Sequence, residues 1–316
     1  MTEQEKYPEY IRQFFDARGI TEFELVEENA RKGRYCFSFR EGEKQRFLKW
    51  NMAGEQYELY HSALFTEQKV YQALQGKNVT PVYVPEEDYP ELVVSEFLTE
   101  SETLRSRLKK LVEGEAEDGK EHDKEALNDD KATDAAIRAL VEKMLTKWRT
   151  YVETLSQSEV DISRVETGER LFKKYLSSIL TSGPFDTKAG KLENYMNRAR
   201  NKFITKFRMG KVRKMIGQCG YEELPFVHGD FHANNILVAG DEPMIIDLES
   251  TRTGIPEIEL AYMYAQIVLL IRDRKELIHQ LNQFIKKEMT FLRDRRVFAF
   301  FFRIYYRAIR KNHRFY

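Results

Sequence analysis

The apolar residues of the chain change their spacing near residue 100. Before that point, short runs rich in β-branched and aromatic side chains, bounded by turn residues, predict strands. They cover Glu22–Glu27, Arg34–Arg40, Gln45–Trp50, Pro81–Val84 and Leu92–Phe97. Two segments have helical spacing instead, one over Tyr7–Phe15 and one roughly over Tyr60–Leu74. The first hundred residues therefore predict a small sheet with two helices.

From Thr103 onward the pattern is mainly helical. The longest apolar stripe with a period near 3.6 predicts one long helix, and it consists of Ile137, Leu140, Val141, Met144, Leu145, Trp148, Tyr151, Val152 and Leu155. Further helices are expected over 169–180, over 192–216 and from Pro256 to the C-terminus. Two short β segments, Ile236–Val238 and Met244–Ile246, flank a turn. Strands followed by helices indicate an α+β fold rather than alternating βαβ units.

Candidate chemistry concentrates in Phe226–Ser250, FVHGDFHANNILVAGDEPMIIDLES. Phosphoryl transfer to a hydroxyl needs an oriented acceptor, bound metal ions and neutralised phosphoryl charge. The Asp230 carboxylate can accept the acceptor proton, and the Asn235 amide oxygen is a suitable hard ligand for Mg²⁺. The predicted hairpin folds the chain back and returns Asp247 beside Asn235. Asp230 and Asp247 are then expected on opposite sides of the transferring phosphate.

These motifs resemble a known family. H-G-D-x-x-x-x-N followed by an apolar-apolar-D-x-E segment is similar to the aminoglycoside-phosphotransferase and choline-kinase superfamily, and Gly229 replaces the Arg of the protein-kinase pattern. The resemblance implies a bilobal protein-kinase-like fold with a small antiparallel-sheet N-lobe and a mainly helical C-lobe. The implied nucleotide-binding lobe is 1–98 with a hinge at 95–99. The implied C-lobe, 99–316, contains a catalytic loop at 228–235 and a metal-binding segment at 244–249.

The same resemblance implies roles for matched positions. Asp230 is the catalytic base, Asn235 and Asp247 are the metal ligands, and His228 braces the loop. His232 is either a substrate or phosphate contact or a plain loop residue. Glu259 stands where the family usually has Asp.

The N-terminal lobe supplies the implied nucleotide contacts. Lys49 matches the lysine that contacts the α- and β-phosphates, and Glu67 is the best candidate for its partner, in competition with Glu55 and Glu58. The resemblance also implies nucleotide contacts from Gly33, in the phosphate loop 28–34, and from Ile246. Backbone groups of Glu96 and Leu98 would bind adenine.

Charge is distributed unevenly along the chain, although the net charge is zero, with 51 basic and 51 acidic residues. Segment 113–134 is rich in acid and predicts a charged, mobile loop, with extension of the flanking helices as the alternative. The C-terminal region is basic, and Arg303, Arg307, Arg310 and Arg314 share one helical face. That face is either solvated or contacts an anionic partner. The second alternative suggests an anionic acceptor, such as an acidic sugar or saccharide.

Several classes of protein are disfavoured. Two cysteines are too few for a disulfide framework or a zinc site, and no apolar run is long enough for a membrane span. The N-terminal residues contain no apolar segment of the kind found in a signal peptide. We therefore expect a cytoplasmic protein. No P-loop pattern is found, so a P-loop nucleotide site is not expected. No RNA-recognition motif is found either, so nucleic acid is not an expected partner. The oligomeric state is not determined by the sequence.

The predicted function is an ATP- and Mg²⁺-dependent phosphotransferase acting on a hydroxyl of a small molecule. One alternative is a non-catalytic, pseudokinase-like nucleotide-binding protein, supported by the glycine-poor loop at 28–34. A protein kinase is the other, and it is disfavoured because only about ten residues separate Asp247 from Glu257, too few for an activation segment.

Overall fold

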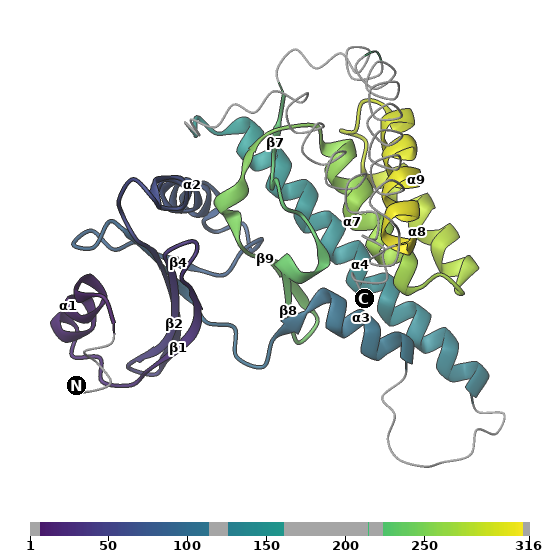
Figure 1. Cartoon of the computed structure of the whole chain (residues 1–316). Helices are drawn as coiled ribbons and strands as arrows, with labels where there is room; N and C mark the ends of the chain where they lie inside the picture. The colour runs from purple at the N-terminus through teal and green to yellow at the C-terminus, as the bar shows by residue number, and fades with distance from the viewer. Residues whose placement is uncertain (1–6, 114–125, 161–213, 215–223, 312–316) are drawn as a thin grey trace, which may run out of the picture.

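The computed structural model describes residues 7–113, 126–160, 214 and 224–311. Figure 1 shows a sheet with two helices on one side of the molecule and a group of helices on the other, with short strands between them. The predicted α+β class, with a sheet-containing N-terminal part and a helical C-terminal part, is confirmed. The helices expected over 169–180 and 192–216 lie outside the described residues, apart from residue 214.

A five-stranded antiparallel sheet, ordered β1-β2-β3-β5-β4, forms the N-terminal part. Its strands are β1 (Phe23–Asn29), β2 (Arg34–Glu41), β3 (Lys44–Asn51), β4 (Tyr83–Val84) and β5 (Leu92–Glu96). All five strands were predicted, with small shifts at their ends. Helix α1 (Glu9–Ala17) covers one face, where its Phe14 and Phe15 pack against Phe37 and Phe39 of β2.

Alternation along β3 decides which residues face each helix. Leu48 belongs to the aromatic cluster under α1, so its neighbour Lys49 points to the opposite face. Helix α2 (Glu58–Leu74) covers that opposite face and presents buried Glu67 to it. A lysine on a sheet face covered by a helix has no access to bulk water, so it requires charged partners.

Helix α4 (Ala126–Gln157) is the centre of the C-terminal part. Its predicted apolar stripe is buried, with Trp148 and Tyr151 fully inaccessible. Around it lie α3 (Leu104–Glu113), α7 (Pro256–Leu270), α8 (Lys275–Glu288) and α9 (Arg295–Lys311). The prediction of a loop up to residue 134 was wrong at its end, because α4 already begins at Ala126; residues 114–125 lie outside the described residues. Extension of the flanking helix, the alternative, holds for 126–134.

Short strands lie between the sheet and the helices (Figure 1). The predicted hairpin is present as β8 (Ile236–Ala239) and β9 (Glu242–Ile245), and β6 (Glu102–Thr103) adds a third strand beside β8. A second pair consists of β7 (Phe226–Val227) and β10 (Arg252–Thr253). The 3₁₀ turn η2 (Ala233–Asn235) forms the end of loop 228–235, and the 3₁₀ turn η3 (Leu248–Ser250) follows the hairpin. Within the described part of the chain, no helix combines the length and the apolar character needed to cross a membrane.

Replacing Leu145 by Ala tests the importance of the α4 stripe. Leu145 is fully buried, so Leu145→Ala should lower the free energy of unfolding by about 2–5 kcal/mol, because truncation leaves a cavity. Glu153→Ala, at an exposed position of the same helix, should change it by less than about 0.5 kcal/mol. Urea unfolding followed by circular dichroism measures both. Equal effects of the two variants would contradict a core role for the stripe.

Candidate active site

Lys49 is the centre of a buried ion cluster that joins the two parts of the chain. Its ammonium nitrogen lies 2.7 Å from Glu67 Oε2, 2.9 Å from Asp247 Oδ1 and 2.8 Å from Glu249 Oε2. Glu67 comes from α2, whereas Asp247 and Glu249 come from the segment after β9. Of the three candidate partners in the sequence, Glu67 is the one that the structure places at Lys49.

Burial and the neighbouring charges both shift the pKa values of this cluster. Burial alone would lower the pKa of Lys49, but Glu67, Asp247 and Glu249 raise it well above its ordinary value. Burial would raise the pKa of Asp247, yet the charge of Lys49 and its hydrogen bond lower it. For Glu67 burial prevails over the attraction of Lys49, and its pKa is raised. Lys49 and Asp247 are therefore both charged at neutral pH.

Arg34 is a further cation of the cluster that sequence reasoning missed. It opens β2, it is buried, and its guanidinium forms an ion pair with Glu249. Burial would lower its pKa, but Glu249 raises it. Glu249 is itself buried at this pair. The only signal for Arg34 in the sequence is its position directly after Gly33, at the end of the phosphate loop.

The three carboxylates near Lys49 are also close enough to one another to hold a cation. Single oxygens of Glu67, Asp247 and Glu249 lie within 4.8 Å of one another. However, the Lys49 ammonium is in contact with all three. The protein's own cation therefore already neutralises part of this group.

Glu259 anchors the backbone of loop 228–235 through several hydrogen bonds. Its carboxylate accepts hydrogen bonds from the backbone N–H groups of His228 (3.1 Å) and Gly229 (2.6 Å) and from the Trp148 indole (2.9 Å). The His228 ring is fully buried; its Nδ1 accepts from the Asp230 N–H at 3.3 Å, and its Nε2 lies 2.8 Å from the Ile246 carbonyl. His228 therefore connects the loop to β9 and its continuation, as the bracing role requires.

Gly229 has a conformation and an environment that exclude a side chain. Its φ is +84°, and a Cβ atom there would lie 2.1 Å from the Ser250 carbonyl oxygen. The Arg252 guanidinium donates a hydrogen bond to the Gly229 carbonyl at 2.7 Å. The close approach of η3 therefore explains why glycine replaces the arginine of the protein-kinase pattern.

Asp230 and Asn235 are arranged differently from these bracing residues. The Asp230 side chain is 46% exposed, and its Oδ2 lies 3.5 Å from His232 Nε2. Burial would raise its pKa, but the hydrogen bond and charge of His232 lower it below its ordinary value. The Asn235 amide nitrogen donates to the Asp230 carbonyl at 2.9 Å, which directs its side-chain oxygen elsewhere. His232 is therefore a direct neighbour of the Asp230 carboxylate.

The hairpin returns Asp247 to this loop as the spacing predicted. Ile236 pairs with Ile245, and the Ile246 N–H donates to the Asn235 carbonyl at 3.0 Å. Asp247 follows with left-handed backbone angles, φ 61° and ψ 54°. Asn235 and Asp247 are therefore brought to the same edge of the hairpin.

The remaining nucleotide-site candidates lie around the sheet. Gly33 ends the β1–β2 turn with a φ of +59°, and a Cβ atom there would lie 2.9 Å from the Tyr57 ring. Glu96 ends β5, and its N–H donates to the Val82 carbonyl. The Leu98 carbonyl accepts from Ser101, and within the described residues no hydrogen bond uses the Leu98 N–H. Leu98 therefore offers a backbone donor at the hinge, but the Glu96 N–H is already used.

Comparisons with known proteins agree with this geometry. The model of the "Phosphotransferase enzyme family" matches residues 197–295, which include loop 228–235 and the hairpin. The resemblance to the aminoglycoside-phosphotransferase and choline-kinase superfamily is confirmed. A sequence search of curated proteins found no match.

Solved structures with this fold share little sequence with the chain. An aminoglycoside phosphotransferase, APH(3'')-Id from Streptomyces rimosus, is 13% identical, with a TM-score of 0.53 over 93% of this chain and 96% of that one. An ethanolamine kinase from Plasmodium vivax is 12% identical, with a TM-score of 0.50 over 92% of this chain and 74% of that one. At these identities the likeness concerns the fold, and it confirms the predicted bilobal, kinase-like architecture.

The lowered pKa of Asp247 predicts a pH dependence of stability. Because the folded-state pKa lies below the ordinary value near 3.9, ionised Asp247 stabilises the protein above that pH and this contribution is lost as the pH falls. Asp247→Asn should therefore show a shallower loss of melting temperature than wild type between about pH 5 and pH 2.5. Asp241→Asn, in the exposed hairpin turn, is the control. Parallel curves for wild type and Asp247→Asn would refute the proposed coupling to Lys49.

Proposed function

We propose that the protein is an ATP- and Mg²⁺-dependent phosphotransferase that phosphorylates a hydroxyl of a small molecule, with an anionic sugar or saccharide as the acceptor class. One observation carries the proposal. A loop and a hairpin bring Asp230, Asn235 and Asp247 together, and Asp247 contacts Lys49, which is paired with Glu67. This set supplies a base, metal-binding oxygens and a cation for phosphate charge.

Asp230 fits the role of the base. Its lowered pKa keeps it ionised at neutral pH, and nearly half of its side chain is open to an approaching hydroxyl. His232 fixes one carboxylate oxygen from the side. The carboxylate then orients the acceptor oxygen and takes its proton as the bond to phosphorus forms.

Asn235 and Asp247 are suited to Mg²⁺. The metal, when bound, neutralises negative charge on the phosphate oxygens. A neutral amide oxygen and a carboxylate are hard donors of the kind that Mg²⁺ prefers. The amide nitrogen of Asn235 is held by the Asp230 carbonyl, so the opposite, oxygen end of the amide is the part available to a cation. Asp247 is 30% exposed and is therefore reachable.

The nucleotide is assigned to the space between the sheet and the hairpin. Lys49 would contact the α- and β-phosphates, with Glu67 setting its position. The adenine would bind the carbonyl of Glu96 and the N–H of Leu98, which no hydrogen bond uses within the described residues. Gly33 and Ile246 would lie on either side of the phosphates and ring. In this assignment residues 1–98 form the nucleotide-binding lobe and residues 99–316 the acceptor-binding lobe, and the cytoplasmic location stays a prediction.

Asp230→Asn tests the base. The substitution should lower kcat by about 10²–10⁴-fold, because proton transfer from the acceptor is lost while the side-chain shape is kept. Release of ADP from Mg²⁺-ATP is measured with a panel of cationic, neutral and anionic hydroxyl acceptors. Asp241→Asn, in the turn of the hairpin, should keep the wild-type rate. Full activity of Asp230→Asn would refute the mechanism, whereas nucleotide binding without turnover of any acceptor would favour the non-catalytic alternative.

Glu67→Gln tests the partner of Lys49. Loss of one charged hydrogen bond should lower kcat/KM for ATP by roughly ten- to hundredfold. Glu55→Gln is the matched control, since Glu55 is exposed just before the same helix, and it should leave kcat/KM unchanged. Thermal melting of both variants separates misfolding from the effect on catalysis. An unchanged kcat/KM in Glu67→Gln would remove Glu67 from the nucleotide site.

A further inference from the structure

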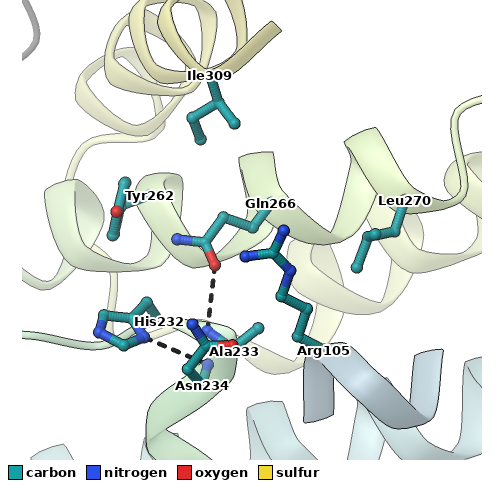
Figure 2. Close-up of a pocket in the computed structure, with 8 residues that line it drawn as sticks. All are labelled: Arg105, His232, Ala233, Asn234, Tyr262, Gln266, Leu270 and Ile309. Carbon is teal, nitrogen blue, oxygen red and sulfur yellow. Dashed lines mark hydrogen bonds between the residues drawn. The ribbon is translucent and has the colours of Figure 1, made fainter. Parts of the chain in front are cut away.

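A cavity of about 150 Å³ lies beside the catalytic loop, and none of the roles assigned above uses it. It is bounded by four elements, and the lining residues are Arg105, His232, Ala233, Asn234, Tyr262, Gln266, Leu270 and Ile309. One water of the liquid occupies about 30 Å³, so the cavity is large enough for a small charged group such as a carboxylate or a phosphate. In Figure 2 the side chains of Arg105, Gln266 and Tyr262 surround the space above His232 and Asn234.

The cavity is directly connected to the catalytic base. His232, which lines it, contacts Asp230 through Nε2 and accepts the Asn234 N–H through Nδ1 at 3.2 Å. Tyr262 also lies near Asp230. Burial raises the pKa of Tyr262, and the charge of the Asp230 carboxylate adds to that effect. Gln266 accepts the Ala233 N–H at 3.2 Å and so fixes the floor of the cavity to α7. A group that contacts His232 in the cavity is therefore separated from the Asp230 carboxylate by one side chain.

Arg105 is the cation of this cavity, and it has no anionic partner in the described part of the chain. Its position in the second residue of α3 makes it half-buried. The other cations of α3 all pair with carboxylates, Arg107 and Lys110 with Glu102, and Lys109 with Glu113. A half-buried guanidinium that lacks an anion, beside cations that have one, indicates a site for a ligand anion.

We propose that Arg105 binds an anionic group, a carboxylate or a phosphate, of the acceptor whose hydroxyl is presented to Asp230. The guanidinium donates in a planar fork that matches both kinds of oxyanion. Gln266 and Tyr262 add neutral polar groups beside it. This inference rests on the proposed function, and it gives that function's acceptor a charge and a point of attachment.

The chemistry also explains why the anion would not compete at the catalytic base. Asp230 carries a negative charge beside His232, so an acceptor anion is repelled from the His232 side of the cavity. Arg105 lies on a different side of the cavity from His232 (Figure 2) and attracts the anion there. A hydroxyl acid or a sugar phosphate is thereby bound in one orientation, with its hydroxyl toward Asp230.

The first experiment measures anion binding without catalysis. Sulfate is titrated calorimetrically into the full chain saturated with ADP and Mg²⁺. We expect Arg105→Ala to weaken sulfate binding by about ten- to hundredfold, Arg105→Lys to restore part of it, and Lys109→Ala, which removes the same charge from an exposed position of α3, to leave it unchanged. Equal binding in wild type and Arg105→Ala, or equal loss in Lys109→Ala, would overturn the inference.

The second experiment measures turnover with matched acceptors. Glucose is compared with glucuronate and with glucose 6-phosphate, which separates a carboxylate from a phosphate as the preferred anion. Wild type should prefer one anionic member in kcat/KM, and Arg105→Ala should lower that preference by about ten- to hundredfold with KM for ATP unchanged.

The outcomes separate the inference from the proposed function. Turnover that favours glucose, or an anionic preference that survives in Arg105→Ala, would overturn the role of Arg105 while supporting a phosphotransferase. A raised KM for ATP with the acceptor preference intact would also overturn it, because Arg105 would then serve the nucleotide. If no acceptor is turned over, the proposed function fails for this panel and the sulfate titration alone decides on Arg105.

Discussion

A lysine that is shielded from water must be neutralised by nearby negative charge. This requirement determines how the two parts of the molecule are joined. Lys49 is only 4% exposed, and its partners come from α2 and from the segment after β9. Because one partner belongs to the sheet-containing part and two to the helical part, the cluster fixes the two parts against each other where nucleotide is proposed to bind. Breaking one partner of such a cluster leaves a buried charge uncompensated, which costs much more than the net value of the pair.

The net charge of the cluster also matters for binding of the proposed ligand. Three carboxylates face two cations, Lys49 and Arg34, so the group has an excess of negative charge. The pKa of Glu67 is raised mainly by burial, and the charges of Asp247 and Glu249 add to that effect. A divalent cation at Asp247 would offset the excess of negative charge, and the phosphates of a nucleotide would in turn offset the cations. Metal and nucleotide are therefore expected to bind more favourably together than separately.

Rigid and reactive groups are segregated around the catalytic loop. His228 and Glu259 are hydrogen-bonded on several sides, whereas Asp230 is half open to solvent. The backbone of the loop is thus held by buried hydrogen bonds, while Asp230, the proposed base, remains accessible to solvent. Such an arrangement supplies orientation before the substrate arrives, which is the main contribution a protein makes to phosphoryl transfer.

Much of the fold and of the candidate site was predictable wherever the residues responsible lie close together in the sequence. The strands, the long stripe of α4 and the hairpin follow from local periodicity, and the return of Asp247 to Asn235 follows from the hairpin. Arg34 was missed because its partner, Glu249, is 215 residues away and only the fold brings them together. Arg105 was missed for the opposite reason, since its distinguishing property is that it has no partner in the described chain. The loop prediction failed over 126–134 because acid-rich composition does not exclude a helix that gains stability from packing.

The left-handed backbone at Asp247 limits what mutation can do there. One base change in an aspartate codon reaches glutamate, asparagine and glycine, among others. Glutamate keeps the charge, but it adopts this conformation less readily than aspartate or asparagine. Asparagine and glycine suit the backbone but remove the charge that faces Lys49. No single step from this codon preserves both the conformation and the carboxylate, so the position has no conservative neighbour in sequence space.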